Sequence, residues 1–186
     1  MQNRAIETKN KLITIGLEVI AEYGYYNVTM DEIAKRCNLS TGGAYRYFKN
    51  KKDLFIAIIK YYYENVSNFA NLNDYSAFKT FEDYLSDVFD KFLLVHRNYY
   101  GIHEELEGLC HIDKEIKNIK EEILANAIYR ITEKANEVVN VTHLREKVVI
   151  SIGLMENAIH SIIEFPEEVN ADVIKNETIR IISSLF

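Results

Sequence analysis

Hydroxyl, amide and cationic side chains gather between residues 29 and 54, in the run TMDEIAKRCNLSTGGAYRYFKNKKDL. Such groups are the usual protein partners of phosphate oxygens, and an arginine can also form two hydrogen bonds with a guanine edge. Two consecutive glycines among them would let the backbone approach a ligand closely. The run therefore predicts contact with duplex DNA. The contact residues that we expect are Thr29, Ser40, Thr41, Gly42, Gly43, Tyr45, Arg46, Tyr47, Lys49 and Lys51.

Two short helices joined by a sharp turn must position these groups. Thr29 and Glu32 have the spacing of a capping box, which predicts the start of the first helix. Asn38 tolerates the left-handed conformation that a sharp turn requires, and Ser40 is suited to cap the second helix. This pattern predicts a helix-turn-helix.

The second helix should have a buried face and an outward face. The spacing of side chains predicts a buried face of Ala44, Tyr47 and Phe48, and it directs Thr41, Gly43, Tyr45 and Arg46 elsewhere. Asn50 should then cap a longer helix. We expect the first amides of that helix, together with Lys51, to form a second phosphate clamp.

The ordered residues of this region resemble the tetracycline-repressor (TetR) family of bacterial transcriptional regulators. The matches are Gly24-Tyr25, Thr29, Ile33-Ala34, Leu39-Ser40, Gly42, Tyr45-Arg46-Tyr47-Phe48 and Lys51-Lys52-Asp53-Leu54. The chain departs from the family at Ala44, where a larger Leu or Ile is commoner, and at Gly43, where Thr or Ala is commoner. The resemblance implies a homodimer on a near-palindromic double-stranded DNA operator, released by a small-molecule inducer.

Composition and periodicity predict an all-α chain. Proline occurs once and glycine seven times among 186 residues, and apolar residues recur at spacings of three and four. We expect a three-helix DNA-binding domain over residues 1–52 and a larger helical ligand-binding and dimerisation domain over residues 53–186, with about nine helices in all. Beyond the helix-turn-helix, the expected helices are Arg4–Tyr23, Asn50–Asn71, Ser76–His96, Tyr100–Leu109, Asp113–Val138, His143–Ile163 and Ala171–Leu185.

Charge is divided unequally along the chain. Residues 1–60 hold 10 Lys and Arg against 6 Asp and Glu, a net charge of +4, whereas residues 61–186 hold 12 against 22, a net charge of −10. The two parts make up the overall net charge of −6. A basic head on an acidic body is typical of a nucleic-acid-binding protein.

Several classes of protein are not expected. No apolar run approaches the length of a membrane span and the amino end lacks a signal pattern, so we expect a cytoplasmic protein with no membrane partner. The sequence holds no Gly-rich phosphate loop and no nucleophile elbow, so we expect neither an enzyme nor a cofactor. The pairs His103 with Glu107 and Glu156 with His160 have a spacing that suits two metal ligands, but no third ligand of fixed spacing accompanies them, and we expect no metal site.

The last two predicted helices carry more apolar surface than a small body needs. We assign them to dimerisation, as the resemblance also implies; the alternative is that both helices complete the core of one subunit. The predicted interface residues are Leu144, Val148, Ile152, Met155, Ile159, Val173, Ile174 and Ile181.

A ligand cavity is expected in the body, mostly apolar with a few polar groups. Its candidate lining residues are Tyr62, Phe89, Phe92, Tyr99, Tyr100, His103, Met155, Glu156 and His160. Aromatic residues at helical spacing also occur in ordinary cores. The alternative function is an all-helical ligand-binding or interaction protein that has lost specific DNA binding, and the glycines at positions 42 and 43 are its main support.

Overall fold

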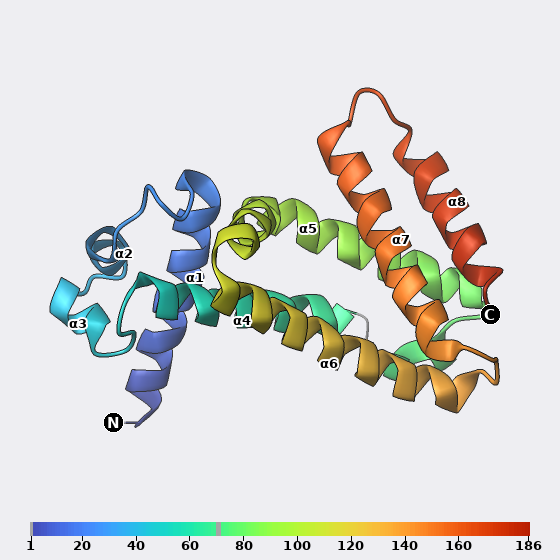
Figure 1. Cartoon of the computed structure of the whole chain (residues 1–186), viewed down its shortest axis with the longest axis horizontal. Helices are drawn as coiled ribbons and strands as arrows, with labels where there is room; N and C mark the ends of the chain where they lie inside the picture. Colours follow the sequence, from blue (N-terminus) through green and yellow to red (C-terminus); the bar gives the residue numbers. More distant parts are fainter. Residues whose placement is uncertain (1, 70–71) are drawn as a thin grey trace. The chain divides into compact units, whose positions relative to one another are not determined.

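The computed structural model describes residues 2–69 and 72–186, with the side chains of all these residues except 2, 66–69, 72–74 and 138. Every regular element among the described residues is helical, which confirms the predicted all-α class (Figure 1). The elements are α1 (Gln2–Tyr23), α2 (Met30–Arg36), α3 (Thr41–Tyr45), α4 (Lys51–Phe69), a 3₁₀ helix η1 (Leu72–Ala77), α5 (Phe81–Ile112), α6 (Lys114–Val138), α7 (Leu144–Glu164) and α8 (Ala171–Ser183). The predicted end of α4 at Asn71 lies outside the described residues.

The chain packs as two compact units. The head unit consists of Met1–Glu64 and Tyr99–Ile123, and the body unit consists of Asn65–Asn98 and Leu124–Phe186. Helices α4, α5 and α6 therefore each contribute residues to both units. The predicted functional division between residues 52 and 53 stays a prediction, because compactness reports packing and not function.

The core of the head unit is apolar and comes from both of its chain segments. Side chains of α1, α2 and α4 are fully buried, among them Leu12, Ile33 and Phe55. Helix α5 approaches α1 so closely that a Cβ atom on Gly101 would lie 2.2 Å from the carbonyl oxygen of Ala21. Only a residue without a side chain fits there, because the nearby atom belongs to the backbone.

Helix α5 is interrupted where the sequence predicts a break, but it begins later than predicted. The ranges Ser76–His96 and Tyr100–Leu109 were predicted as separate helices, and the predicted break between them is confirmed, because α5 consists of two helical stretches on either side of the non-helical Tyr99 (φ −126°, ψ 21°). The predicted start at Ser76 is wrong, because that residue lies in η1. The helix begins after Thr80, whose Oγ1 accepts a hydrogen bond from the Asp83 N–H at 3.1 Å. This cap satisfies an amide that has no partner within the helix.

The body unit is built around an apolar cluster to which α5, α7 and α8 contribute. Phe89, Ile159 and Ile182 are fully buried in it. Helices α7 and α8 lie side by side (Figure 1), and Asn170 caps α8 by accepting a hydrogen bond from the Val173 N–H at 3.1 Å.

Among the described residues, no helix combines the length and the apolar character that crossing a membrane requires.

Candidate nucleic-acid interface

The first helix of the predicted helix-turn-helix begins at a complete capping box. The Thr29 N–H donates to Glu32 Oε2 at 2.7 Å, and the Glu32 N–H donates to Thr29 Oγ1 at 3.3 Å. Each residue thus satisfies an amide of the other, as the sequence predicts. Met30, Ile33 and Ala34 of α2 are buried, which fixes the orientation of the helix on the head unit.

The turn between α2 and α3 has the predicted conformation. Asn38 is left-handed, with φ of 59°. The Leu39 N–H donates to the Ala34 carbonyl at 2.9 Å, and Ser40 Oγ accepts from the Gly43 N–H at 3.1 Å. The first hydrogen bond closes the turn and the second caps α3. The predicted caps of both helices, Thr29 for α2 and Ser40 for α3, are therefore confirmed.

The recognition segment, residues 40–49, has one buried and one exposed side. Ala44 is fully buried and Phe48 is 3% exposed, while Tyr47 is half-buried. Tyr45 is 48% exposed, and Arg46 is exposed beside it. The exposed members of the segment that could meet DNA are Ser40, Gly42, Tyr45, Arg46 and Lys49, which we call the outer set.

The three predicted contacts from serine and threonine already hold structural hydrogen bonds. Thr29 and Ser40 cap their helices, and Thr41 Oγ1 donates to Asp31, which also pairs with Lys35 at 2.6 Å. Hydrogen bonds from Lys35 and Thr41 hold the pKa of the Asp31 carboxyl below its usual range. The Thr41 contact therefore connects α3 to α2, and a role in DNA binding stays a prediction for these three side chains.

Lys51 points toward the turn between α1 and α2. Its Nζ donates to the carbonyls of Tyr25 at 2.5 Å and Val28 at 2.6 Å, and it lies 4.4 Å from the centroid of the Tyr25 ring. Burial lowers the pKa of this ammonium group. A phosphate would have to compete with these partners, so the predicted phosphate contact of Lys51 stays untested. We call these contacts of Lys51 with the two carbonyls the lysine clamp. The sequence did not predict the lysine clamp, because its acceptors are backbone carbonyls, which every residue has.

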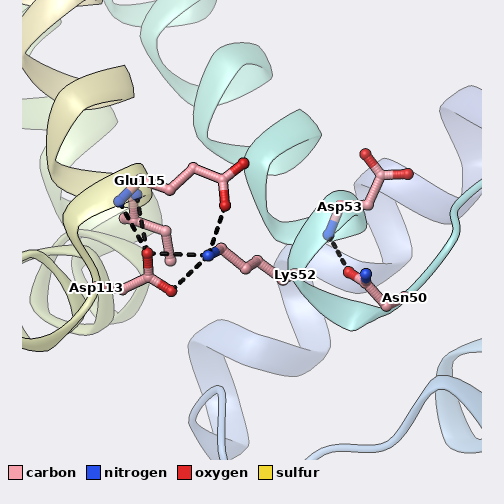
Figure 2. A network of polar contacts seen from close by, with 6 residues as sticks. Asn50, Lys52, Asp53, Asp113 and Glu115 are labelled. Atoms are coloured by element: carbon pink, nitrogen blue, oxygen red, sulfur yellow. Dashed lines mark hydrogen bonds and ion pairs between the residues drawn. The ribbon is translucent and has the colours of Figure 1, made fainter.

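Lys52 joins the start of α4 to the start of α6 (Figure 2). Its Nζ lies 2.7 Å from Asp113 Oδ2 and 2.6 Å from Glu115 Oε2. Asp113 also caps α6, because its Oδ1 accepts from the N–H groups of Glu115 and Ile116 at 3.0 and 3.2 Å. The hydrogen bond from Lys52 holds the pKa of Asp113 below its usual range.

The start of α4 is capped as predicted. Asn50 Oδ1 accepts a hydrogen bond from the Asp53 N–H at 2.8 Å (Figure 2). Asp53 in turn accepts a hydrogen bond from the Lys49 N–H at 3.0 Å. The backbone that leads out of the recognition segment is therefore tied to the first turn of α4.

A glutamate from α5 holds the turn after α1. Glu105 Oε2 accepts a hydrogen bond from the Tyr25 N–H at 3.0 Å. Gly24 has a φ of 83°, and its N–H donates to the Ile20 carbonyl at 2.8 Å, so this glycine forms the cap at the end of α1. A Cβ atom on Gly24 would lie 2.8 Å from Glu105 Oε1. Nothing in the sequence links two positions 80 residues apart, so this contact could not have been predicted.

One lysine of α1 lies beside the recognition segment. The Nζ atom of Lys9 is 5.6 Å from the centroid of the Phe48 ring. This contact connects α1 to the buried side of the recognition segment.

The predicted ligand residues divide between the two units. Tyr62, Tyr99, Tyr100 and His103 belong to the head unit, whereas Phe89, Phe92, Met155, Glu156 and His160 belong to the body unit. Within the head unit, the rings of Tyr62 and Tyr99 are 6.2 Å apart. Tyr62, Phe89, His103 and Met155 are buried and the other five are half-buried. Their role in ligand binding stays a prediction.

The His103 and Glu107 side chains share a helical face, as their spacing predicts. His103 Nε2 lies 3.9 Å from Glu107 Oε1. The Glu107 carboxylate also pairs with the ammonium group of Lys120. A protein cation thus already neutralises this carboxylate, which favours a structural role for the pair.

The predicted interface residues differ in how much surface they offer. Leu144, Val148, Met155 and Ile159 are buried within the body unit, Ile152 and Ile174 are half-buried, and Val173 and Ile181 are 57% and 41% exposed. Burial of the first four favours the alternative, in which they complete the core of one subunit. Val149 and Ile150 of α7, 45% and 49% exposed, were not predicted.

Comparison with known proteins agrees with the geometry of the head. The family model described as "Bacterial regulatory proteins, tetR family" matches residues 12–58. The fatty acid metabolism regulator protein of Bacillus subtilis (strain 168) is 42% identical over 50 residues, which cover 27% of this chain and 26% of that protein. The chain thus spans about a quarter of the length of this curated relative.

Solved structures share the whole fold at low sequence identity. A TetR-family transcriptional regulator from Mesorhizobium loti MAFF303099 has a TM-score of 0.80 at 12% identity, with 98% of each chain covered. The fatty acid degradation regulator FadR from Bacillus halodurans has a TM-score of 0.72 at 18% identity, with 94% of each chain covered. The family match over residues 12–58 and the confirmed helix-turn-helix identify this part of the head as the regulatory-protein domain of the TetR family, and the solved structures share the fold of the whole chain.

Proposed function

We propose that this protein is a transcriptional repressor that binds a near-palindromic DNA operator as a homodimer and is released by a small-molecule inducer. One observation carries the proposal: the recognition segment buries Ala44 and Phe48 and leaves Tyr45 and Arg46 exposed. Burial on one side holds α3 in place, while the other side offers a hydroxyl and a guanidinium group. The match of the head to a family of regulatory proteins is consistent with a regulator and not an enzyme.

The outer set has the chemistry of both backbone and base contacts. Tyr45 and Lys49 are suited to phosphate oxygens, and Arg46 can form two hydrogen bonds with guanine. A Cβ atom on Gly42 would meet nothing within 4 Å, so the protein itself does not require glycine there. The missing side chain instead allows the backbone of α3 to approach the duplex.

A salt titration tests DNA binding. The full chain is titrated with a random 30-base-pair duplex at several salt concentrations. A phosphate-binding head should lose affinity steeply as salt rises, because binding releases counterions. Tyr45→Ala should weaken binding to the operator and to random DNA by similar factors, and Lys49→Ala, which removes a charge that can neutralise a phosphate, should reduce the salt slope by about 1. Lys60→Ala, which removes an exposed lysine from α4 outside the outer set, is the matched control and should leave the slope unchanged.

The alternative function predicts a different result. A helical ligand-binding protein that has lost specific DNA binding would show no salt-dependent affinity for any duplex. The glycines at positions 42 and 43 favour this alternative, because they leave fewer side chains to read bases. Absence of binding in the titration at low salt would therefore replace the repressor proposal by this one.

Dimerisation is proposed through α7 and α8. A two-fold dimer would present two recognition helices about 34 Å apart, one turn of B-DNA. The exposed apolar side chains of these adjacent helices support this assignment: Val149, Ile150, Val173 and Ile181.

Sedimentation velocity tests the proposed interface. The double substitution Ile150→Glu with Val173→Glu places charges on the exposed apolar surface and should convert a dimer to a monomer. Ile112→Glu is the control, because Ile112 is 70% exposed but lies at the end of α5 in the head unit. A wild-type chain that sediments as a monomer at all concentrations would contradict the dimer, and equal dissociation of both variants would contradict the assignment to α7 and α8.

A further inference from the structure

The body unit contains a cavity of about 110 Å³. Residues of η1, α5, α6, α7 and α8 line it, together with the last residue of the chain, Phe186. Of the nine ligand residues predicted from the sequence, only Phe92 and Met155 are among its lining residues. The cavity is therefore a different candidate site from the predicted one.

The lining of the cavity is almost wholly apolar. Aromatic rings form part of the wall, among them Tyr75, Phe81 and Tyr84, with ring centroids 5.6 to 6.3 Å apart. Aliphatic side chains complete it, among them Ile131 and Met155. None of the described lining residues is a lysine, arginine, histidine, aspartate or glutamate.

The polar groups in the wall offer little to a charged ligand. Ser151 Oγ donates its proton to the Lys147 carbonyl at 2.8 Å. Tyr84 is 6% exposed, and burial raises the pKa of its phenol, so this group stays neutral. A buried charge without an opposite charge or strong hydrogen bonds is costly, so the apolar wall disfavours an ionised group within this space.

We infer that this cavity is a binding site for a small uncharged hydrocarbon ligand. Apolar cavities of roughly this size stay dry and admit molecules such as benzene. The ligand gains by leaving water and by filling space in which the lining atoms have no contacts. This inference names the chemical class of the proposed inducer. Binding of the ligand follows from the cavity alone, whereas its effect on DNA binding rests on the proposed function.

One helix provides a physical basis for that link. Ile131 and Ala135 of α6 line the cavity in the body unit. The same helix begins beside Asp113, which pairs with Lys52 in the head unit. A ligand that binds better to one arrangement of α6 would shift the population toward that arrangement.

Calorimetric titration of the full chain without DNA tests the site. The probes are benzene and 1-hexanol, with hexanoate and hexyltrimethylammonium as charged ligands that carry the same alkyl chain. The neutral probes should bind saturably, and each charged probe should bind at least about tenfold more weakly. Binding of a charged probe as tightly as 1-hexanol, or no binding of either neutral probe, would overturn the inference.

Cavity-filling variants locate the site. Ala135→Leu and Ser151→Leu each place a larger apolar side chain on the wall, and each should weaken 1-hexanol binding by about tenfold or more. Ala125→Leu is the matched control, because it adds the same atoms at an exposed position of α6 and should bind as the wild type does. Circular dichroism shows whether each variant is folded. Two wall variants are used so that the test remains possible if one of them does not fold. Wild-type affinity in a folded wall variant would show that the probes bind elsewhere.

Measuring DNA affinity with and without 1-hexanol tests this inference separately from the proposed function. Saturating 1-hexanol should lower the affinity of the wild-type chain for its operator and leave that of Ala135→Leu unchanged. If 1-hexanol binds without DNA but no duplex is bound at all, the proposed function fails and the cavity site stands. If DNA binds and neither neutral probe does, the cavity site fails and the proposed function stands.

Discussion

The two units of this protein differ in the contacts that stabilise each of them internally. In the head unit, polar groups from remote segments meet at defined atoms: Lys51 holds two carbonyls, Glu105 holds the Tyr25 amide, and Lys52 pairs with the cap of α6. The body unit depends on an apolar cluster that surrounds Phe89, and a cavity lies within the same unit. Both units have apolar cores, and the head adds polar contacts between remote segments that need particular distances and directions.

This difference matches what each unit has to do. Hydrogen bonds weaken steeply when donor and acceptor are displaced, so the polar contacts that supplement the apolar core of the head favour one orientation of its recognition helix. Apolar attraction is not directional and is roughly proportional to buried area, so a body built on it can leave space for a ligand. Four pairs of substitutions test this contrast, from the largest expected effect to the smallest.

The largest effect is expected in the apolar core of the body. Phe89→Ala removes a fully buried ring and should lower the free energy of unfolding by about 3–5 kcal/mol. Phe89→Leu keeps most of the apolar volume and should cost less than the alanine variant. Urea denaturation measures both. Equal losses for Ala and Leu would show that packing around this ring does not stabilise the body.

The second effect concerns the close approach of α5 to α1 in the head. Gly101→Ala would place a Cβ atom 2.2 Å from the Ala21 carbonyl oxygen, so the helices must move apart. A loss of about 2–3 kcal/mol in the free energy of unfolding is expected. Gly108→Ala is the control in the same helix, since nothing lies within 4 Å of its Cβ, and it should gain up to about 1 kcal/mol.

Hydrogen exchange shows where the Gly101 variant acts. Amides of α1 should exchange faster in Gly101→Ala, while those of α8 should change little. A stability gain in both glycine variants would mean that the close approach to α1 imposes no constraint.

The third effect comes from the lysine clamp of the head. Lys51→Met keeps the apolar stem but leaves the carbonyls of Tyr25 and Val28 without this donor, at an expected cost of about 1–3 kcal/mol. Lys49→Met removes an exposed ammonium from the outer set and should change the free energy of unfolding by less than about 0.5 kcal/mol.

Measuring DNA affinity in the same two variants distinguishes the roles of the lysines. Lys49→Met should weaken binding to random DNA without loss of stability. If Lys51→Met leaves thermal stability unchanged but weakens DNA binding, Lys51 is a phosphate contact and the clamp is not what holds the turn.

The smallest effect lies in the recognition helix itself. Gly42→Ala adds a Cβ in open space and should stabilise α3 by about 0.5 kcal/mol, because alanine favours helix more than glycine does. Gly43→Ala places its Cβ 3.2 Å from Ser40 Oγ, the atom that caps the helix, and should bring no gain. Thermal denaturation compares the two variants. A larger gain at position 43 than at position 42 would mean that the Ser40 cap adjusts without cost.

Local patterns predicted the helix-turn-helix correctly. The Thr29 capping box, the left-handed Asn38, the Ser40 cap and the Gly24 cap all depend on groups within a few residues of one another. Their geometry follows from backbone conformation and short-range hydrogen bonding, and both depend on the local amino-acid sequence.

Contacts between residues far apart in the chain could not be predicted from local sequence patterns. Glu105 and Tyr25 are 80 residues apart, and Lys52 and Asp113 are 61 apart. Many surface acids could have paired with Lys52, and nothing local selects Asp113. The isolated Gly101 within a helical pattern did carry a signal, because such a glycine often marks a close packing contact. That signal does not name the helix that makes the approach.

The amino-acid sequence alone determined the helical class, the two short helices with their caps, and the charge difference between head and body. Hydrophobic period, capping chemistry and ionisable side chains act locally, so their consequences do not depend on the rest of the chain. Only the tertiary structure decided that Lys51 points toward backbone carbonyls, that four residues assigned to an interface are buried in the core, and that an apolar cavity lies among η1, α5, α6, α7 and α8. Those outcomes depend on which surfaces meet when distant segments fold together, and an apolar stripe on a helix is equally suited to a core, a cavity wall or a partner.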